Sequence, residues 1–353
     1  MVGPTLAGDG VEYVREAIGA RRAVVVSDSN VAPLYADALA ESLAVPARDR
    51  LKVQAGEQSK SRAEWARLTD AMLANEVGRD SVVVAVGGGV VGDLAGFVAA
   101  TYMRGVPVIQ VPTTLLAMID AAVGGKTGVD TAAGKNLVGA FHQPSLVLAD
   151  PTVLATLPID QLRNGLAEAL KHAMISSTVE LEWLLANAAT LTDPANAESP
   201  QFTELVARNL QIKVGVVQRD ERESGVRKSL NFGHTIGHAI EVVCEFTMLH
   251  GACVGVGMRT EAEIAVRLGL AASTLPARID AALMALGLPL SPTRRLNPAD
   301  VLAATRVDKK ARAGAVEYAL VRDVGIVAGS ESGYGTPVDN QIVLGALSEC
   351  LAG

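Results

Sequence analysis

Short runs of apolar residues alternate with longer amphipathic segments over the first 150 residues of the chain. Three runs, at residues 23–27, 81–86 and 107–111, are rich in valine or isoleucine and are followed by polar residues, glycines or prolines. Between them, segments such as residues 61–75 repeat apolar positions at helical spacing. Continuous apolar strands that alternate with helices are typical of a parallel sheet covered on both faces. We therefore expect an α/β domain whose ligands bind at the carboxyl ends of the strands.

The pattern changes after about residue 151. Long helical patterns at residues 159–176, 203–219, 234–245 and 255–268 dominate, and strand-like runs are scarce before residues 316–321. Residues 187–200 are rich in Ala, Asn and Pro, and we expect an exposed connection between helices there. The sequence thus predicts two domains, an α/β domain at residues 1–155 and a mainly α-helical domain at residues 156–353.

Composition and charge mainly exclude functions. Hydrophobic residues make up 49% and charged residues 20% of the chain, as in a globular protein with a full core. The formal net charge of −7 argues against nucleic acid as a partner. Cys244, Cys253 and Cys350 form neither a CxxC site nor a disulfide framework. With no secretory signal and no apolar run long enough to cross a membrane, we expect a cytoplasmic protein.

A glycine-rich segment follows the second apolar run. Gly87, Gly89 and Gly92 match the spacing G-x-G-x-x-G between a predicted strand and a predicted helix. Small residues at such a turn let backbone N–H groups approach a pyrophosphate at the helix N-terminus. Dinucleotide-binding folds usually have an acidic residue about 20 residues further on that holds a ribose, and this chain lacks it. Asp93 would stabilise the helix N-terminus by its charge even without a ligand, so its presence is no evidence for one. A tight turn without a ligand remains the alternative.

Three of the five histidines lie between residues 234 and 250. His234 and His238 lie one helical turn apart, but the glutamate that serves as general base in metalloproteases is absent between them. A catalytic zinc site takes three protein ligands, and His250 and Glu168 are candidates for the others. Glu168 lies in an apolar helical stretch, where a carboxylate needs a partner. Hydrogen-bonded structural histidines, and a surface position for Glu168 near Lys171, remain alternatives.

Basic residues recur beside glycines. Lys126 follows Gly124 and Gly125, and Lys135 follows Gly134, so two lysines lie in what we interpret as glycine-rich loops. Further cations are Arg104, Lys213, Arg227, Lys309 and Lys310. The first loop is not a P-loop, because its leading glycine is missing. Any one of these residues is typical of a solvated surface, but together they favour binding of a small anion.

In their order and spacing, these segments resemble the 3-dehydroquinate synthase family of sugar-phosphate cyclases over nearly the whole chain. The resemblance is carried by residues 87–96, 112–120, 124–139, 167–171, 230–241 and 249–251. It implies an α/β nucleotide-binding domain, an α-helical metal-binding domain and a homodimer. It also implies NAD and Zn²⁺ as cofactors, with Co²⁺ as an alternative metal.

The resemblance also implies roles for individual residues. The zinc ligands would be Glu168, His234 and His250. The NAD site would comprise Asp28, Asn30, Glu57, Lys60, Gly88, Gly89, Val90, Val91, Gly92, Asp93, Thr113, Thr114, Lys126, Lys135 and Thr156. The substrate and catalytic residues would be Arg104, Asp120, Lys126, Lys135, Asn136, Lys171, Lys213, Arg227, Asn231 and His238.

The reaction implied by the resemblance converts the keto-acid phosphate 3-deoxy-D-arabino-heptulosonate 7-phosphate to 3-dehydroquinate and phosphate. Bound NAD would oxidise an alcohol transiently, which acidifies the neighbouring proton so that phosphate can leave. Return of the hydride and an intramolecular aldol step would then close the ring. The protein would mainly orient the intermediates and stabilise enolate charge.

The sequence departs from the family pattern at Ala252, where the family usually has a glutamate after His-Gly. We expect that glutamate to support a zinc ligand rather than to bind zinc, so zinc binding should survive. The segment before the first strand is also short. Alternative interpretations are a valiolone or deoxy-inosose synthase, a polyol dehydrogenase of the glycerol-dehydrogenase type, and an inactive homologue. His238, Leu230 and Lys213 favour dehydroquinate synthesis over other cyclases, and Lys126 with Lys135 favours a phosphorylated acidic substrate.

Overall fold

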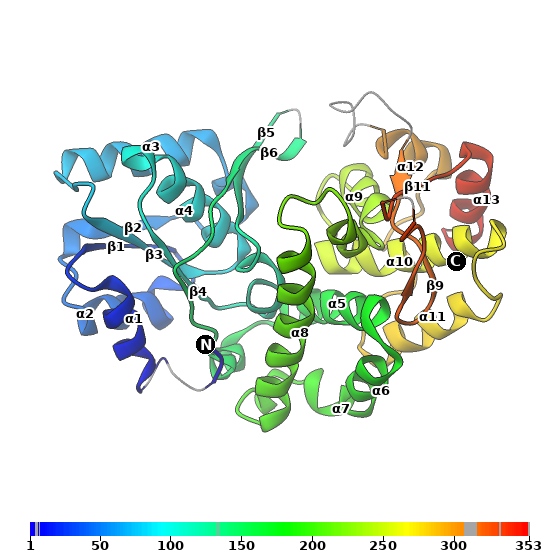
Figure 1. Cartoon of the computed structure of the whole chain (residues 1–353), viewed down its shortest axis with the longest axis horizontal. Helices are drawn as coiled ribbons and strands as arrows, with labels where there is room; N and C mark the ends of the chain where they lie inside the picture. Colours follow the sequence, from blue (N-terminus) through cyan, green and yellow to red (C-terminus); the bar gives the residue numbers. More distant parts are fainter. Residues whose placement is uncertain (4–5, 7, 133, 307–315, 332, 352–353) are drawn as a thin grey trace. The chain divides into compact units, whose positions relative to one another are not determined.

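The computed structural model describes residues 1–3, 6, 8–132, 134–306, 316–331 and 333–351 (Figure 1). Lys309 and Lys310 therefore lie outside the described residues. The chain divides into two compact units. The first, which we call the N-terminal unit, comprises Met1–Leu157 and Ala195–Leu210, and the second, the C-terminal unit, comprises Pro158–Pro194 and Gln211–Gly353.

The N-terminal unit contains a five-stranded sheet with the order β2-β1-β3-β4-β7, in which every pairing is parallel. Its strands are β1 (Arg22–Asp28), β2 (Arg50–Val53), β3 (Ser81–Gly87), β4 (Val108–Pro112) and β7 (Leu146–Val147). The three apolar runs of the sequence form the central strands β1, β3 and β4. The prediction of a parallel α/β sheet is confirmed.

Helices cover both faces of this sheet (Figure 1). Val24 of β1 packs in a cluster with Leu94 of α4, whereas Val25 packs in a second cluster with Leu39 of α2. Successive strand side chains point to opposite faces, so a run of valines supplies apolar contacts to both clusters. The helices are α1 (Gly10–Ile18), α2 (Asp37–Ser42), α3 (Arg62–Ala74) and α4 (Gly89–Thr101).

Lys126 and Lys135 lie in the strands of an antiparallel hairpin, so the interpretation of two glycine-rich loops was wrong. The hairpin consists of β5 (Lys126–Thr131) and β6 (Gly134–Phe141). Leu137, Val138 and Phe141 of β6 are exposed, so the strand has no buried apolar face that sequence periodicity could reveal. Short helical turns complete the unit: η1 (Ala32–Ala36), η2 (Ala47–Asp49), η3 (Glu57–Ser59), η4 (Tyr102–Arg104), η5 (Ala117–Ala121), η6 (Pro151–Thr156) and η7 (Pro194–Asn196).

The C-terminal unit is mainly helical, as predicted. Its helices are α5 (Ile159–Ser176), α6 (Thr178–Ala186), α7 (Ala188–Leu191), α8 (Pro200–Arg219, shared with the N-terminal unit), α9 (His234–Val243), α10 (His250–Arg267), α11 (Leu275–Ala285), α12 (Pro298–Ala304), α13 (Asn340–Cys350) and the turn η8 (Val226–Asn231). Short strands β8 (Glu317–Tyr318), β9 (Val321–Asp323), β10 (Ile326–Val327) and β11 (Thr336–Pro337) form two antiparallel pairs. Among the described residues, no helix combines the length and apolar character needed to cross a bilayer.

Two sequence predictions in this half were wrong. Residues 187–200 are not simply an exposed connection, because they contain α7 and bury Ala188, Leu191 and Ala197. The helix expected at residues 255–268 begins earlier, with His250 as its first residue. Gly251 is a poor helix former, which hid this start. The backbone N–H of Gly251 is held by the side-chain oxygen of Asn164 at 2.5 Å.

Candidate active site

The β3–α4 turn lies at the carboxyl ends of the neighbouring strands β3 and β4. Gly88 is the N-cap residue of α4, and the Thr113 N–H at the end of β4 donates to the Gly87 carbonyl at 2.9 Å. A Cβ on Gly88 would lie 3.1 Å from the methyl group of Thr114, and one on Gly92 would lie 2.9 Å from Gln110 Oε1. The turn therefore presents backbone at the N-terminus of a helix, the arrangement that binds phosphate groups.

Asp28 and Asn30 follow the carboxyl end of the neighbouring strand β1. The Asp28 carboxylate accepts hydrogen bonds from the backbone N–H groups of Asn30 and Val31, at 2.8 and 3.0 Å, and the Asn30 side chain is exposed. Thr156 lies near the turn that follows β1, because its hydroxyl is 2.6 Å from the Tyr35 hydroxyl. The sheet edge thus brings these residues close to β1, as the parallel topology requires.

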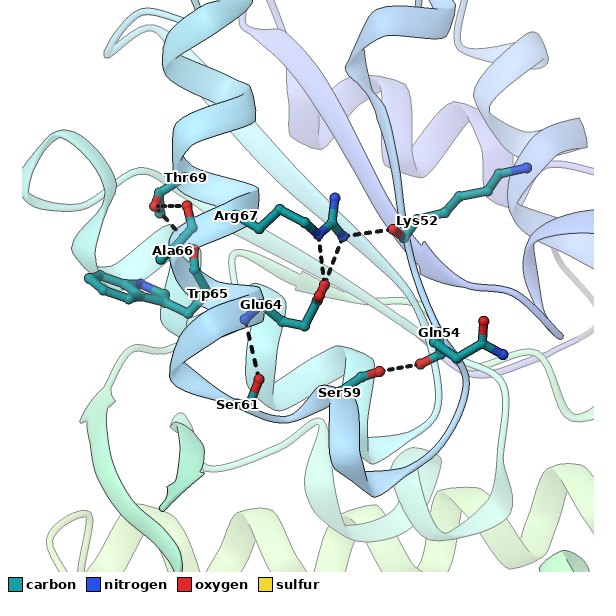
Figure 2. Close-up of polar contacts among 9 residues, drawn as sticks. All are labelled: Lys52, Gln54, Ser59, Ser61, Glu64, Trp65, Ala66, Arg67 and Thr69. Carbon is teal, nitrogen blue, oxygen red and sulfur yellow. Dashed lines mark hydrogen bonds and ion pairs between the residues drawn. The ribbon is translucent and has the colours of Figure 1, made fainter. Parts of the chain in front are cut away.

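The segment that carries Glu57 and Lys60 is anchored to its surroundings on both sides (Figure 2). Ser59 donates to the Gln54 carbonyl, and the Ser61 hydroxyl accepts from Glu64 N–H as the N-cap of α3. Arg67 then joins the Glu64 carboxylate to the Lys52 carbonyl. The backbone around the two candidate residues is therefore held in place without using their side chains.

Lys60 is buried and its ammonium pairs with the Asp93 carboxylate in α4. Burial lowers the pKa of Lys60, but the charge of Asp93 outweighs it, so the pKa lies above its usual value. Asp93 thus has a partner inside the fold as well as a favourable position at the helix end. The pair ties the segment of η3 to the glycine turn.

Asp130 of β5 links the hairpin to the same segment. Its N–H donates to the Lys60 carbonyl at 2.7 Å, and its carboxylate accepts from the Asn136 N–H at 2.9 Å. The Lys135 ammonium lies 3.4 Å from the Glu57 carboxylate. Burial raises the pKa of Asp130 above its usual value. The structure therefore brings together Glu57, Lys60, Lys135 and Asn136 around a residue that sequence reasoning missed.

Three further candidates belong to this unit, and one of them, Asp120, is the neighbour of Ala121, whose side chain would lie 3.4 Å from a Cβ on Gly89 of the glycine turn. Lys126 is exposed at the start of β5, where it pairs with Phe141, at the opposite end of the hairpin from Lys135. Arg104 is exposed in η4, separated from the glycine turn by α4, whose 13 residues span about 20 Å. Asp120 is half-buried in η5.

In the C-terminal unit, three helices bring Glu168, His234 and His250 together. Glu168 of α5 is fully buried, and its Oε1 lies 3.4 Å from Nε2 of each histidine. A tetrahedral ion with bonds of about 2.0–2.1 Å holds its ligand atoms about 3.4 Å apart. The three residues therefore fit a zinc ion, with one position left for substrate.

Hydrogen bonds at the far side of each ring fix the orientation of these histidines. His234 Nδ1 lies 3.2 Å from the Phe232 carbonyl, and His250 Nδ1 lies 3.2 Å from Glu241 Oε2. A carbonyl or carboxylate at Nδ1 selects the form in which Nδ1 carries the proton and Nε2 offers its lone pair. Both Nε2 atoms therefore face Glu168 and could offer a lone pair to a metal ion bound there.

The charges of the cluster also suit a metal ion. Burial, opposed by the charge of Glu168, lowers the pKa of His234 to about 3, so its ring is neutral at pH 7. Burial also lowers the pKa of His250, but hydrogen bonds to Glu168 and Glu241 outweigh it and raise the pKa to about 10. Lys171, buried one turn along α5, forms an ion pair with Glu168. A metal ion bound beside Glu168 would displace the proton on Nε2 of His250.

Close packing of α9 on α10 sets the spacing of the histidines. A Cβ on Gly257 would lie 2.0 Å from the Gly233 carbonyl oxygen, and one on Gly237 would lie 3.0 Å from the Val254 backbone. The buried Glu261 carboxylate of α10 accepts from the N–H of Gly233 at 2.6 Å, at the start of α9. Glycines let the helix backbones touch, and Glu261 fixes their register.

The remaining candidates in this unit lie near the cluster or in the loop before α9. The ring centroid of His238 lies 5.3 Å from that of His234 and 5.7 Å from that of His250. Lys213 is buried in α8. Arg227 is buried in η8 and donates to the Glu221 carbonyl, and Asn231 donates to Glu223 Oε1 at 2.6 Å.

Sequence reasoning missed Glu241, Glu261 and Asn164. Each is a buried polar side chain in an apolar helical pattern, and each accepts a hydrogen bond from a ligand-bearing element. The signal that singled out Glu168 was therefore present for all three.

Comparison with known proteins gives consistent results. The family model described as 3-dehydroquinate synthase N-terminal matches residues 50–164, and the one described as 3-dehydroquinate synthase C-terminal matches residues 165–311. A 3-dehydroquinate synthase of Symbiobacterium thermophilum is 47% identical over 305 residues, which cover 85% of this chain and 84% of that protein.

Two solved structures share the fold closely. A 2-epi-5-epi-valiolone synthase from Streptomyces hygroscopicus, with NAD⁺ and Zn²⁺ bound, has a TM-score of 0.85 at 31% identity and covers 98% of this chain and 94% of its own. A 2-deoxy-scyllo-inosose synthase, complexed with carbaglucose-6-phosphate, NAD⁺ and Co²⁺, has a TM-score of 0.85 at 27% identity and covers 97% and 95%. With both family models matched and a relative this similar, the chain belongs to the 3-dehydroquinate synthase family of phosphate-eliminating cyclases.

Proposed function

We propose that the protein converts 3-deoxy-D-arabino-heptulosonate 7-phosphate to 3-dehydroquinate and phosphate, a step of the shikimate pathway toward aromatic amino acids. The observation that carries the proposal is the cluster of Glu168, His234 and His250, whose ligand atoms lie within 4.8 Å of one another in a chain of this family. Such a set can polarise the hydroxyl groups of a sugar-derived substrate through a metal ion.

The proposed cofactors are NAD and zinc, with cobalt as the alternative metal. The valiolone and inosose synthases contain NAD⁺ with Zn²⁺ or Co²⁺, which supports the proposal. When bound, NAD supplies a hydride acceptor and the metal a Lewis acid. The residues proposed to hold NAD are those at the carboxyl edge of the sheet and the hairpin: Asp28, Asn30, Glu57, Lys60, Gly88, Gly89, Val90, Val91, Gly92, Asp93, Thr113, Thr114, Lys126, Lys135 and Thr156.

Around the proposed metal site, the Lys171 side chain pairs with Glu168, and His238 places an imidazole beside both proposed histidine ligands. Each can hold or move a proton on substrate oxygen. Substrate and catalytic roles are likewise proposed for the cations and polar residues Arg104, Asp120, Lys126, Lys135, Asn136, Lys213, Arg227 and Asn231. The functional domains proposed are residues 1–155 for NAD and residues 156–353 for metal.

The decisive assay supplies purified protein with Zn²⁺, catalytic NAD⁺ and the heptulosonate phosphate. We expect phosphate release without net NADH, because the hydride returns to the substrate in each turnover. Steady NADH production would instead indicate a polyol dehydrogenase. Phosphate release only from sedoheptulose 7-phosphate or glucose 6-phosphate would indicate another cyclase.

Glu168→Ala tests the metal ligands. Removal of the central carboxylate should reduce both bound zinc and turnover to background, since two histidines alone are a weak site. Metal content by atomic absorption and phosphate release are measured together. Glu182→Ala, which changes an exposed glutamate of α6, is the matched control and should keep both. Full zinc retention in Glu168→Ala would overturn the ligand assignment.

We further propose a cytoplasmic homodimer. Leu137 and Phe141 of β6 are 51% and 52% exposed, and apolar side chains gathered on a hairpin support a contact with a second copy. Sedimentation should give twice the mass of one chain. A monomer at micromolar concentration would contradict the proposal.

A further inference from the structure

The resemblance described under the sequence analysis implies a glutamate at position 252, where this chain has Ala252, so the support of the neighbouring candidate ligand His250 needs an explanation. Ala252 lies two residues after His250 on α10, about 200° around the helix axis. Its side chain packs against the apolar cluster that contains Ile240 and Met248. A side chain at position 252 therefore leads away from the ring of His250.

Glu241 provides the carboxylate that position 252 does not. It lies in α9, is 3% exposed, and places Oε2 at 3.2 Å from His250 Nδ1. On the other side of the same ring, Nε2 lies 3.4 Å from Glu168 Oε1. The imidazole of His250 is thus held between two buried carboxylates, one at each nitrogen.

The start of α10 is supported separately. A glutamate at the third helical position normally stabilises a helix N-terminus by charge and by reaching back to the N-cap N–H. In this chain, the Asn164 side chain accepts from the N–H of Gly251, and Gly251 needs to be a glycine there because a Cβ would lie 2.3 Å from the Asn164 carbonyl oxygen. The helix end is therefore capped from α5 without residue 252.

We propose that Glu241 is the positioning residue of the third metal ligand, and that position 252 makes no contribution to metal binding. The proposal rests on the proposed metal site. By accepting the Nδ1 proton, Glu241 orients the ring and increases the basicity of Nε2. An alanine instead of a glutamate at position 252 then alters only the apolar side of α10. The proposed metal ligands Glu168, His234 and His250 are not affected.

The main test compares Glu241→Gln with Ala252→Glu in the full-length protein. Glutamine keeps the volume of the side chain and removes its charge, so a loss cannot come from packing alone. Competition of apo-protein with a chromophoric chelator for Zn²⁺ and for Co²⁺ should show about 10–100-fold weaker binding for Glu241→Gln. Ala252→Glu should bind within about twofold of the parent protein, and Glu241→Asp should fall between the two variants.

Two outcomes of this comparison would overturn the proposal. One is unchanged metal affinity in Glu241→Gln, and the other is a gain of tenfold or more in Ala252→Glu. Failure of the unaltered protein to bind either metal would instead contradict the proposed function. The two failures are therefore distinguishable.

A measurement on the unaltered protein avoids any effect of substitution on folding. His238, Glu241 and His250 also form a group whose ligand atoms lie within 4.8 Å, so Glu241 could itself bind a metal. Nitrogen-15 spectra of the five histidines in the zinc-loaded protein separate the cases. A hydrogen-bonded Nδ1 proton on His250 supports the positioning role, whereas coordination through Nδ1, or a proton on Nε2, would overturn it.

Discussion

The β3–α4 turn of the N-terminal unit and the crossing of α9 and α10 in the C-terminal unit both use glycine, but for different reasons. At the turn, a Cβ on Gly89 would lie 3.4 Å from the nearest side chain, so glycine leaves backbone open to a ligand. At the crossing, a Cβ on Gly257 would lie 2.0 Å from the Gly233 carbonyl, so glycine lets two backbones touch. The first use produces a recognisable motif, and the second does not.

Gly257→Ala, at the crossing of α9 and α10, should have the largest effect on stability and on metal binding. The clash is with a backbone carbonyl, which no side-chain rotation can relieve, so α9 must move away from α10 and carry His234 with it. We expect the free energy of unfolding to fall by about 3 kcal/mol, and zinc affinity to fall at least about tenfold. Urea unfolding and chelator competition measure the two effects. Gly215→Ala, in α8 with no atom within 4 Å of its Cβ, is the control and should lose neither.

Gly88→Ala should have a smaller effect, confined to ligand binding. Gly88 has φ −75°, which alanine adopts readily, and Thr114 needs to shift by only a few tenths of an ångström. We expect NAD⁺ affinity to fall about tenfold, or about 1.4 kcal/mol, while urea unfolding stays nearly unchanged. Calorimetric titration with NAD⁺ measures this. Unchanged affinity would mean that the turn binds no pyrophosphate.

The loop after α8 gives a third arrangement to compare with the turn and the crossing. Here backbone N–H groups bind an anion that belongs to the chain itself, the carboxylate of Asp220. Its carboxylate accepts from Ser224, Gly225 and Arg227 N–H at 2.7–3.0 Å. Burial would raise the pKa of Asp220, but these hydrogen bonds outweigh it and lower the pKa to about 2. The carboxylate therefore orders the loop that leads to Arg227 and Asn231.

Because this pKa is lowered on folding, the stabilisation by Asp220 is complete above about pH 4, the usual pKa of an aspartate, and is lost as the pH falls toward 2. Asp220→Asn should lower the urea midpoint slightly at pH 6, and the difference from the unaltered protein should shrink between pH 4 and pH 2. A difference that stays constant over this range would contradict the role of the carboxylate charge.

The comparison also explains what the sequence could predict. The central strands are short apolar runs, because their successive side chains pack against the helices on opposite faces of the sheet. The sequence therefore predicted β1, β3 and β4 to within a residue or two. The helices α5 and α9, which carry candidate metal ligands, were equally clear. The hairpin β5–β6 was missed because the large apolar residues of β6 are exposed, and the start of α10 was missed because Gly251 is a poor helix former.

The candidate metal ligands were proposed from a family resemblance, and their proximity is a property of the tertiary structure. Glu168 and His250 lie 82 positions apart in the sequence, and no local pattern relates them. Buried partners such as Glu241 and Glu261 contact their targets across helices, so their roles follow only from packing. Sequence periodicity reports which face is buried and is silent on which neighbour it meets.

The positions of Asn164 and Glu168 on α5 have a consequence for how this protein can change over evolution. Residues four apart lie on one helix face. One turn of α5 therefore sets the distance between Asn164, which caps α10, and the candidate ligand Glu168. Loss of one residue between them would rotate Glu168 by about 100° away from the histidines while the cap stayed in place. We therefore expect insertions and deletions to be absent within this one turn of α5.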